Sequence, residues 1–121
     1  MSFRKKVQNI RPSWRAIVLL WREEYSFRIL ALSAVGTLLA SYILRISRFE
    51  LLVVILTIGA MLATEALNTA IEEICDHVTP EQHHRIAKIK DVASGAAFMM
   101  WCAALVIGLI IFVPYLIHRL W

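Results

Sequence analysis

The chain has 121 residues, of which 60% are hydrophobic, and its mean hydropathy is +0.67. A soluble domain of this length cannot bury so much apolar surface in its own core, so the composition excludes a water-soluble globular protein and indicates a bilayer. The net charge of +4 does not indicate nucleic-acid binding, because a basic cluster precedes the first apolar stretch instead of covering a soluble face. The residues of this cluster are Arg4, Lys5, Lys6, Arg11, Arg15 and Arg22.

The first predicted element is an amphipathic helix over residues 13–28 that lies on the membrane surface. Trp14 and Trp21 belong to its apolar stripe, and charged side chains occupy the other face. This pattern is typical of helices that lie in the plane of the membrane interface. Pro12 suits the first turn of the helix, where its missing N–H costs no hydrogen bond. The basic residues before the first span also predict a cytoplasmic N-terminus beside anionic lipid.

Three stretches long enough to cross a bilayer follow, because a spanning helix needs about 20 mostly apolar residues. They cover residues 29–46, 51–75 and 91–117. Only a short turn joins the first two, so we expect these helices to be antiparallel neighbours. Three spans also place the loop between the second and third span in the cytoplasm. The predicted fold class is an all-α membrane protein, with one surface helix and three transmembrane helices in a single domain, residues 1–121.

Three helices of this length enclose little of a polar site, so we expect a homo-oligomer. Small residues let membrane helices approach one another closely. The sequence provides glycines for such contacts at Gly36, Gly59, Gly95 and Gly108.

Polar side chains recur at helical spacing in the second span. At about 100° per residue they fall on one stripe of a helix. An intramembrane carboxylate is costly unless it faces a partner, a cation or water, so the stripe predicts a polar site that descends from the cytoplasmic interface into the bilayer. For Glu65 taken alone, a helix-packing role is the alternative. The members of the stripe are Glu65, Asn68, Glu72 and Asp76.

Further charged residues are expected at the same interface. Lys90 and Asp91 open the third span, and Glu24 precedes the first span at the expected depth of Glu72. Lysine suits phosphate as a compact point charge, and carboxylates with water suit Mg²⁺. The sequence contains no glycine-rich phosphate loop. These residues therefore predict a polar membrane site with acids, an amide and a lysine, and they leave its chemistry open.

A resemblance to a known family is carried by two runs of sequence: EALNTAIE at residues 65–72, followed by Asp76, and IAKIKDVASGA at residues 86–96. Trp14, Trp21 and Glu24 occur in the matching order. On these residues the chain resembles the prokaryotic diacylglycerol kinase and undecaprenol kinase family, three-span homotrimeric lipid kinases unrelated to soluble kinases. The resemblance implies ATP as substrate, Mg²⁺, and a homotrimer with shared sites in the bacterial inner membrane, its active site facing the cytoplasm.

The resemblance also implies roles for individual residues. Glu65 resembles the catalytic base that takes the proton from the lipid hydroxyl, and Glu24 and Glu72 resemble the carboxylates that hold Mg²⁺. The family's lipid-contacting positions are matched by Trp14, Trp21 and Ser94. Its ATP-binding positions are matched by Asn68, Asp76, Glu81, His83, Lys90 and Asp91.

Two features bear on the acceptor lipid. Leu30 stands where relatives often carry Glu or His, so any acid or base at that position is absent. The run GLIIFVP at residues 108–114 is similar to the undecaprenol kinases of Gram-positive bacteria, which favours undecaprenol as acceptor and undecaprenyl phosphate as product. Phosphorylation of diacylglycerol to phosphatidate is the alternative. A small proton-coupled transporter, in which Glu65 carries the proton, is an alternative of another class.

Overall fold

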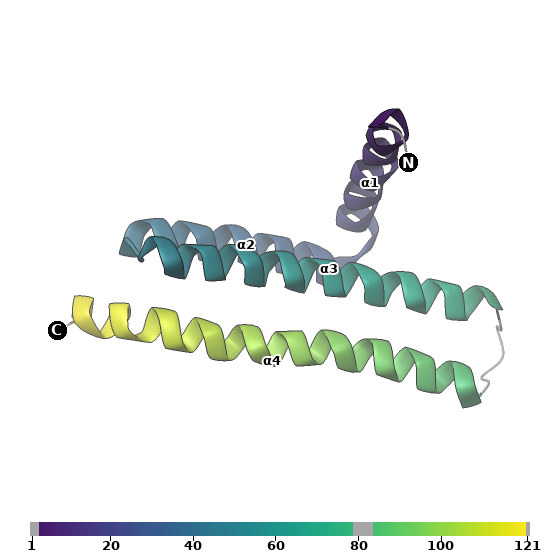
Figure 1. The fold of residues 1–121 in the computed structure, drawn as a ribbon. Helices are drawn as coiled ribbons and strands as arrows, with labels where there is room; N and C mark the ends of the chain where they lie inside the picture. The colour runs from purple at the N-terminus through teal and green to yellow at the C-terminus, as the bar shows by residue number, and fades with distance from the viewer. Residues whose placement is uncertain (1–2, 79–83, 121) are drawn as a thin grey trace.

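The structure is a computed structural model that describes residues 3–78 and 84–120. In Figure 1, the second and fourth helices both lie along the third, and the N-terminal helix projects from them where the second helix begins. The predicted all-helical fold is thus confirmed. The described residues form four helices: α1 (Phe3–Glu23), α2 (Tyr25–Leu44), α3 (Arg48–Val78) and α4 (His84–Leu120).

Within the described ranges, three helices are long and apolar enough to cross a membrane: Tyr25–Leu44, Arg48–Val78 and His84–His118. This confirms the prediction of three long apolar helices. Their ends differ from those of the predicted apolar stretches, and α4 begins seven residues before position 91. The reason is that backbone hydrogen bonds continue a helix through polar residues, whereas hydropathy marks only its apolar part.

The N-terminal helix differs from the prediction at both ends. It begins at Phe3, and Pro12 lies inside it instead of in its first turn. One proline removes one backbone hydrogen bond from a helix, a loss that the chain tolerates here. The helix ends at Glu23 because Glu24 adopts an extended backbone, with φ −105° and ψ 108°. The expected continuous helix to residue 28 is therefore divided, and its last residues belong to α2.

The break at Glu24 is held by hydrogen bonds on both sides. The Glu24 N–H donates to the Leu20 carbonyl at 2.9 Å, and the Glu24 carbonyl accepts from the Arg28 N–H at 3.1 Å. The Arg28 guanidinium also donates to the Arg22 carbonyl at 3.3 Å, near the C-terminus of α1 where cations are favoured. The direction of α1 relative to α2 thus has a defined local cause.

A tight turn joins α2 to α3. We call the end of the helices at which this turn lies the turn end. Arg45 adopts the left-handed conformation, with φ 53° and ψ 52°. Its N–H donates to the Tyr42 carbonyl, and the Ile46 N–H donates to the Ser41 carbonyl, each at 3.3 Å. These two bonds form a Schellman motif, which satisfies two of the last four carbonyls of α2. The predicted short turn and antiparallel pairing of these helices are confirmed.

Helix α3 begins with a capping box. The Glu50 N–H donates to Ser47 Oγ at 3.1 Å, and the Ser47 N–H donates to Glu50 Oε1 at 3.1 Å. The Tyr115 hydroxyl, from the last turns of α4, also donates to Glu50 Oε1. Glu50 therefore links α3 to α4 at the turn end.

Most apolar side chains of the single chain remain exposed. Helix α4 packs chiefly along α3, and α2 contacts α3 less extensively. Of the 18-residue apolar window of α3, only 6% is buried. In the part of the chain that the structure describes, no large side chain is fully buried. The helices thus leave broad apolar faces for lipid or for other copies of the chain. The buried apolar residues are Phe27, Leu30, Val54, Cys75, Ala93, Ala97 and Ile111.

Candidate functional site

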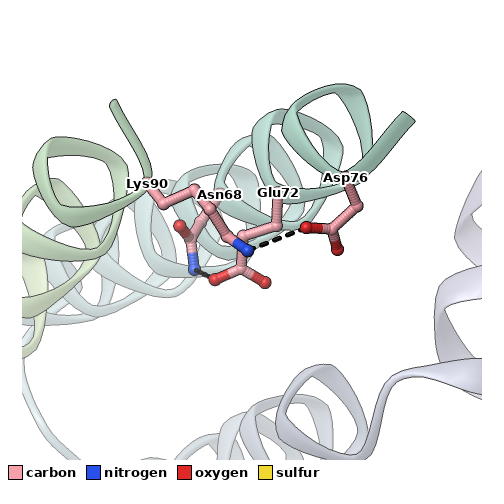
Figure 2. Close-up of polar contacts among 4 residues, drawn as sticks. All are labelled: Asn68, Glu72, Asp76 and Lys90. Carbon is pink, nitrogen blue, oxygen red and sulfur yellow. Dashed lines mark hydrogen bonds and ion pairs between the residues drawn. The ribbon is translucent and has the colours of Figure 1, made fainter. Parts of the chain in front are cut away.

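Polar side chains gather where α3 and α4 approach the 79–83 segment, a region called the linker end. Asn68, Glu72 and Asp76 project from one side of α3, and Lys90 reaches the same side from α4 (Figure 2). Positions four residues apart lie on one face of a helix, which explains the arrangement on α3. The spacing in the sequence therefore predicted this part of the site geometry.

Asn68 and Glu72 are joined within α3. Asn68 Nδ2 donates to Glu72 Oε1 at 3.3 Å, and both residues are half-buried. Asn68 Oδ1 is buried, and no described residue donates to it. A buried polar atom normally has a hydrogen-bond partner, so this oxygen is an acceptor whose hydrogen-bonding capacity is unused within the single chain. The arrangement fits the predicted contact of Asn68 with a nucleotide, a role that stays a prediction.

Asp76 and Lys90 join the two helices at the linker end. Lys90 Nζ lies 2.8 Å from Asp76 Oδ1, and their side chains are 40% and 65% exposed. Exposed ion pairs contribute little to stability, because water screens them and two flexible side chains must be ordered. The pair is therefore better suited to exchanging partners than to holding the helices together. The expectation that Lys90 arrives where the stripe ends is met by this contact.

Glu65 contacts a residue that the sequence did not single out. Ser26 Oγ, in the first turn of α2, donates to Glu65 Oε1 at 2.8 Å. This is a contact between helices, as the packing alternative for Glu65 requires, yet it engages only one carboxylate oxygen. The two residues are 39 positions apart, and only the alignment of α2 with α3 brings them together. The sequence signal that points to Ser26 is its position two residues after Glu24, a predicted site residue.

The carboxylates predicted to hold Mg²⁺ lie on different elements. Glu24 is half-buried at the break between α1 and α2, and its side chain does not cap α2. Among residues 3–78 and 84–120, no group of three or more His, Cys, Asp or Glu side chains could hold a metal. Mg²⁺ is usually bound by one or two carboxylates together with water and substrate phosphates. Glu24 and Glu72 fit that donor set, and their joint role stays a prediction.

The remaining predicted site residues are placed as follows. Trp14 and Trp21 are exposed on α1, whereas Asp91 and Ser94 are exposed on α4. No hydrogen bond between described residues connects Trp14, Trp21 or Ser94 to the stripe, so their contact with lipid stays a prediction. Two predicted ATP-binding residues lie outside the described residues: Glu81 and His83.

Fold and site together define a class of protein, a small multi-pass membrane protein with an acidic site near one end of its helices. Residues 11–112 match the profile of the family described as prokaryotic diacylglycerol kinase. The chain belongs to this family. It is therefore a lipid kinase, and the family implies ATP as the phosphate donor.

Three relatives illustrate the range of similarity. The undecaprenol kinase of Bacillus subtilis is 38% identical over 96 residues, which cover 78% of this chain and 77% of that protein. The diacylglycerol kinase of Synechocystis is 29% identical over 90% of this chain, and the match spans 63% of the relative. The diacylglycerol kinase of Escherichia coli K12 is 25% identical over 86% of this chain and 91% of its own length.

Proposed function

We propose that the protein transfers the γ-phosphate of ATP to the hydroxyl of undecaprenol, and that it releases undecaprenyl phosphate and ADP. The observation that supports this acceptor is the higher identity to the Bacillus subtilis undecaprenol kinase than to the two diacylglycerol kinases. The run GLIIFVP at residues 108–114 favours the same lipid. Diacylglycerol, with phosphatidate as product, is the second candidate, because two of the three relatives carry that name. A transporter is not proposed, because the family is a kinase family.

Glu65 is proposed as the general base. The lipid hydroxyl oxygen attacks the γ-phosphorus, and its proton passes to the Glu65 carboxylate. The bond between the γ-phosphorus and the β–γ bridging oxygen breaks, and ADP leaves with the electron pair. Such a reaction depends mainly on positioning and charge stabilisation. Support comes from the place of Glu65 on the stripe and from the Ser26 contact, which engages Oε1 and leaves Oε2 for the hydroxyl.

The acidic and basic residues around Glu65 are proposed to bind Mg-ATP. Glu24 and Glu72 hold Mg²⁺, which when bound neutralises charge on the phosphate oxygens. Lys90 supplies a positive charge to the phosphates, a role supported by its exposed ion pair at the end of the stripe. The resemblance adds further nucleotide contacts from Asn68, Asp76, Glu81, His83 and Asp91.

Lipid contacts and assembly complete the proposal. Trp14, Trp21 and Ser94 are proposed to contact the acceptor lipid. We further propose a homotrimer with shared sites, which the low burial of the apolar helices supports. The basic N-terminal segment supports an inner-membrane protein whose N-terminus and active site face the cytoplasm.

The proposed reaction can be tested with purified protein in mixed detergent and lipid micelles. Transfer from γ-labelled Mg-ATP to undecaprenol and to diacylglycerol is measured side by side. We expect undecaprenol to have the higher kcat/KM, and Glu65→Gln to lower kcat by at least about 100-fold while ATP binding persists. Glu73→Gln is the matched control, because Glu73 is an exposed neighbour that points off the stripe.

The outcomes separate the parts of the proposal. Preferential phosphorylation of diacylglycerol would establish the second candidate. Normal turnover by Glu65→Gln would show that another group accepts the proton.

A further inference from the structure

The hydrogen bond between Ser26 and Glu65 connects the proposed base to another helix. Its length of 2.8 Å is normal for a hydroxyl donor, and bonds to a carboxylate are stronger than neutral ones. We propose that Ser26 is a positioning residue for phosphoryl transfer, which holds the Glu65 carboxylate so that Oε2 faces the acceptor hydroxyl. This inference rests on the proposed role of Glu65 as the base.

A glutamate needs such support because its side chain is flexible. Rotation about its terminal torsion is only weakly restricted, so an unsupported carboxylate samples many orientations. A general base must lie within hydrogen-bond reach of the proton that it accepts, and small misplacements lower the rate. One hydrogen bond to Oε1 restricts the rotation of the whole carboxylate. The orientation of Oε2 is thereby restricted as well.

Ser26 is well placed to give this support. Its side chain has a single torsion between carbon atoms, so little freedom remains once the backbone is fixed. The backbone of this turn is fixed by the buried side chains of Phe27 and Leu30. The same turn follows directly on the break at Glu24. The start of α2 therefore carries both the positioning group and a carboxylate proposed to bind Mg²⁺.

The chemical role of Ser26 is limited to donation. During transfer the lipid proton passes to Oε2 of Glu65, while Ser26 keeps its own proton and remains bonded to Oε1. No bond to Ser26 forms or breaks. Its loss should therefore slow the chemical step without weakening the binding of Mg-ATP, and this separates positioning from a structural role.

The test compares three variants of the full chain in micelles. Ser26→Ala removes the donor, and Ser26→Thr retains it. Ser41→Ala is the matched control on the same helix, because the Ser41 hydroxyl donates to the Thr37 carbonyl of its own helix at 2.8 Å. The measured quantities are kcat, KM for Mg-ATP, KM for the lipid and Tm.

We expect Ser26→Ala to lower kcat by about tenfold, because a misplaced general base loses only part of its contribution to the rate. The KM for Mg-ATP and the Tm should stay near those of the parent. Ser26→Thr should recover at least half of the parent rate, and Ser41→Ala should stay within about twofold of it. In the Glu65→Gln background, Ser26→Ala should not change the residual rate, because no carboxylate remains to be positioned.

Several results would overturn the proposal. One is an unchanged kcat in Ser26→Ala. Another is a low kcat in Ser26→Thr, which retains the donor. A third is a low kcat in Ser26→Ala accompanied by a large fall in Tm or a rise in KM for Mg-ATP. The last two results would each indicate a structural role. Failure of the proposed base gives a different result, because Glu65→Gln alone would then turn over like the parent.

Discussion

Lys90 Nζ lies 2.8 Å from Asp76 Oδ1, and this ion pair joins the beginning of α4 to the end of the polar stripe on α3. Because both side chains are substantially exposed, the pair contributes little to stability. We predict that Lys90→Gln raises KM for Mg-ATP by about tenfold, the effect of losing a charge-assisted phosphate contact, with little change in Tm. Steady-state kinetics and thermal unfolding in micelles measure the two effects.

The exchange of the two charges provides the control for this prediction. A double variant with Asp76→Lys and Lys90→Asp retains an ion pair but moves the positive charge from α4 to α3. We expect the double variant to remain impaired. Restored activity would show that the pair acts by holding the helices together.

The proposed role of Glu72 as a ligand of Mg²⁺ can be tested by titrating the metal. The Glu72→Gln variant replaces a charged ligand with a neutral amide, which binds Mg²⁺ less strongly. We expect the Mg²⁺ concentration for half-maximal rate to rise by about tenfold or more. Glu73→Gln makes the same chemical change one residue away, on an exposed position off the stripe, and should titrate like the parent. Superimposable titrations for the two variants would contradict the metal role of Glu72.

Glu50 and Tyr115 offer a test at the opposite end of the helices. Tyr115→Phe removes the hydroxyl that donates to Glu50, and Glu50→Gln removes the charge that this hydroxyl and the Ser47 N–H both face. We expect each variant to lower Tm by about 3–5 °C. The effects should add only in part in the double variant, because both substitutions weaken the bond between Tyr115 and Glu50, whereas Glu50→Gln also weakens the contact with the Ser47 N–H. kcat should remain unchanged, and a large loss of rate would show that the turn end takes part in the reaction.

Arg45 occupies a backbone conformation that favours glycine. The left-handed backbone conformation costs a residue with a side chain about 1–2 kcal/mol. Substitution by glycine relieves this cost, but part of the gain is offset by the greater freedom of glycine in the unfolded chain. Arg45→Gly should therefore raise the free energy of unfolding by about 0.5–1 kcal/mol. Arg48→Gly, which also removes one positive charge but lies in the first turn of α3, should lower it. Equal shifts in the two variants would indicate an effect of charge.

The features that the sequence predicted correctly are those set by spacing within one segment. The three long apolar helices follow from hydropathy, and Asn68, Glu72 and Asp76 share a side of α3 because they are four residues apart. Proximity of Lys90 to this stripe was predicted because the chain must return near the point where α3 ends.

The features that the sequence did not predict depend on contacts between segments. The division at Glu24 requires a change of direction between α1 and α2, which no residue type demands. The Ser26–Glu65 bond joins positions 39 apart, and the Tyr115–Glu50 bond joins positions 65 apart. Both depend on how far each helix is shifted along its neighbour. The sequence predicts the start of α1 too late because proline favours the first turn of a helix, whereas this helix continues through Pro12 at the cost of a hydrogen bond.

The stripe on α3 also sets a depth within the membrane. Glu65 and Asp76 are separated by about 16 Å along the helix axis, at 1.5 Å per residue. If Glu65 is the base and Lys90 binds the phosphates, as proposed, the nucleotide would enter from the linker end, and the lipid would bring its hydroxyl to the level of Glu65. On this proposal, discrimination between acceptors would depend on how deep in the bilayer each lipid places its hydroxyl, and the length of the hydrocarbon tail would matter less.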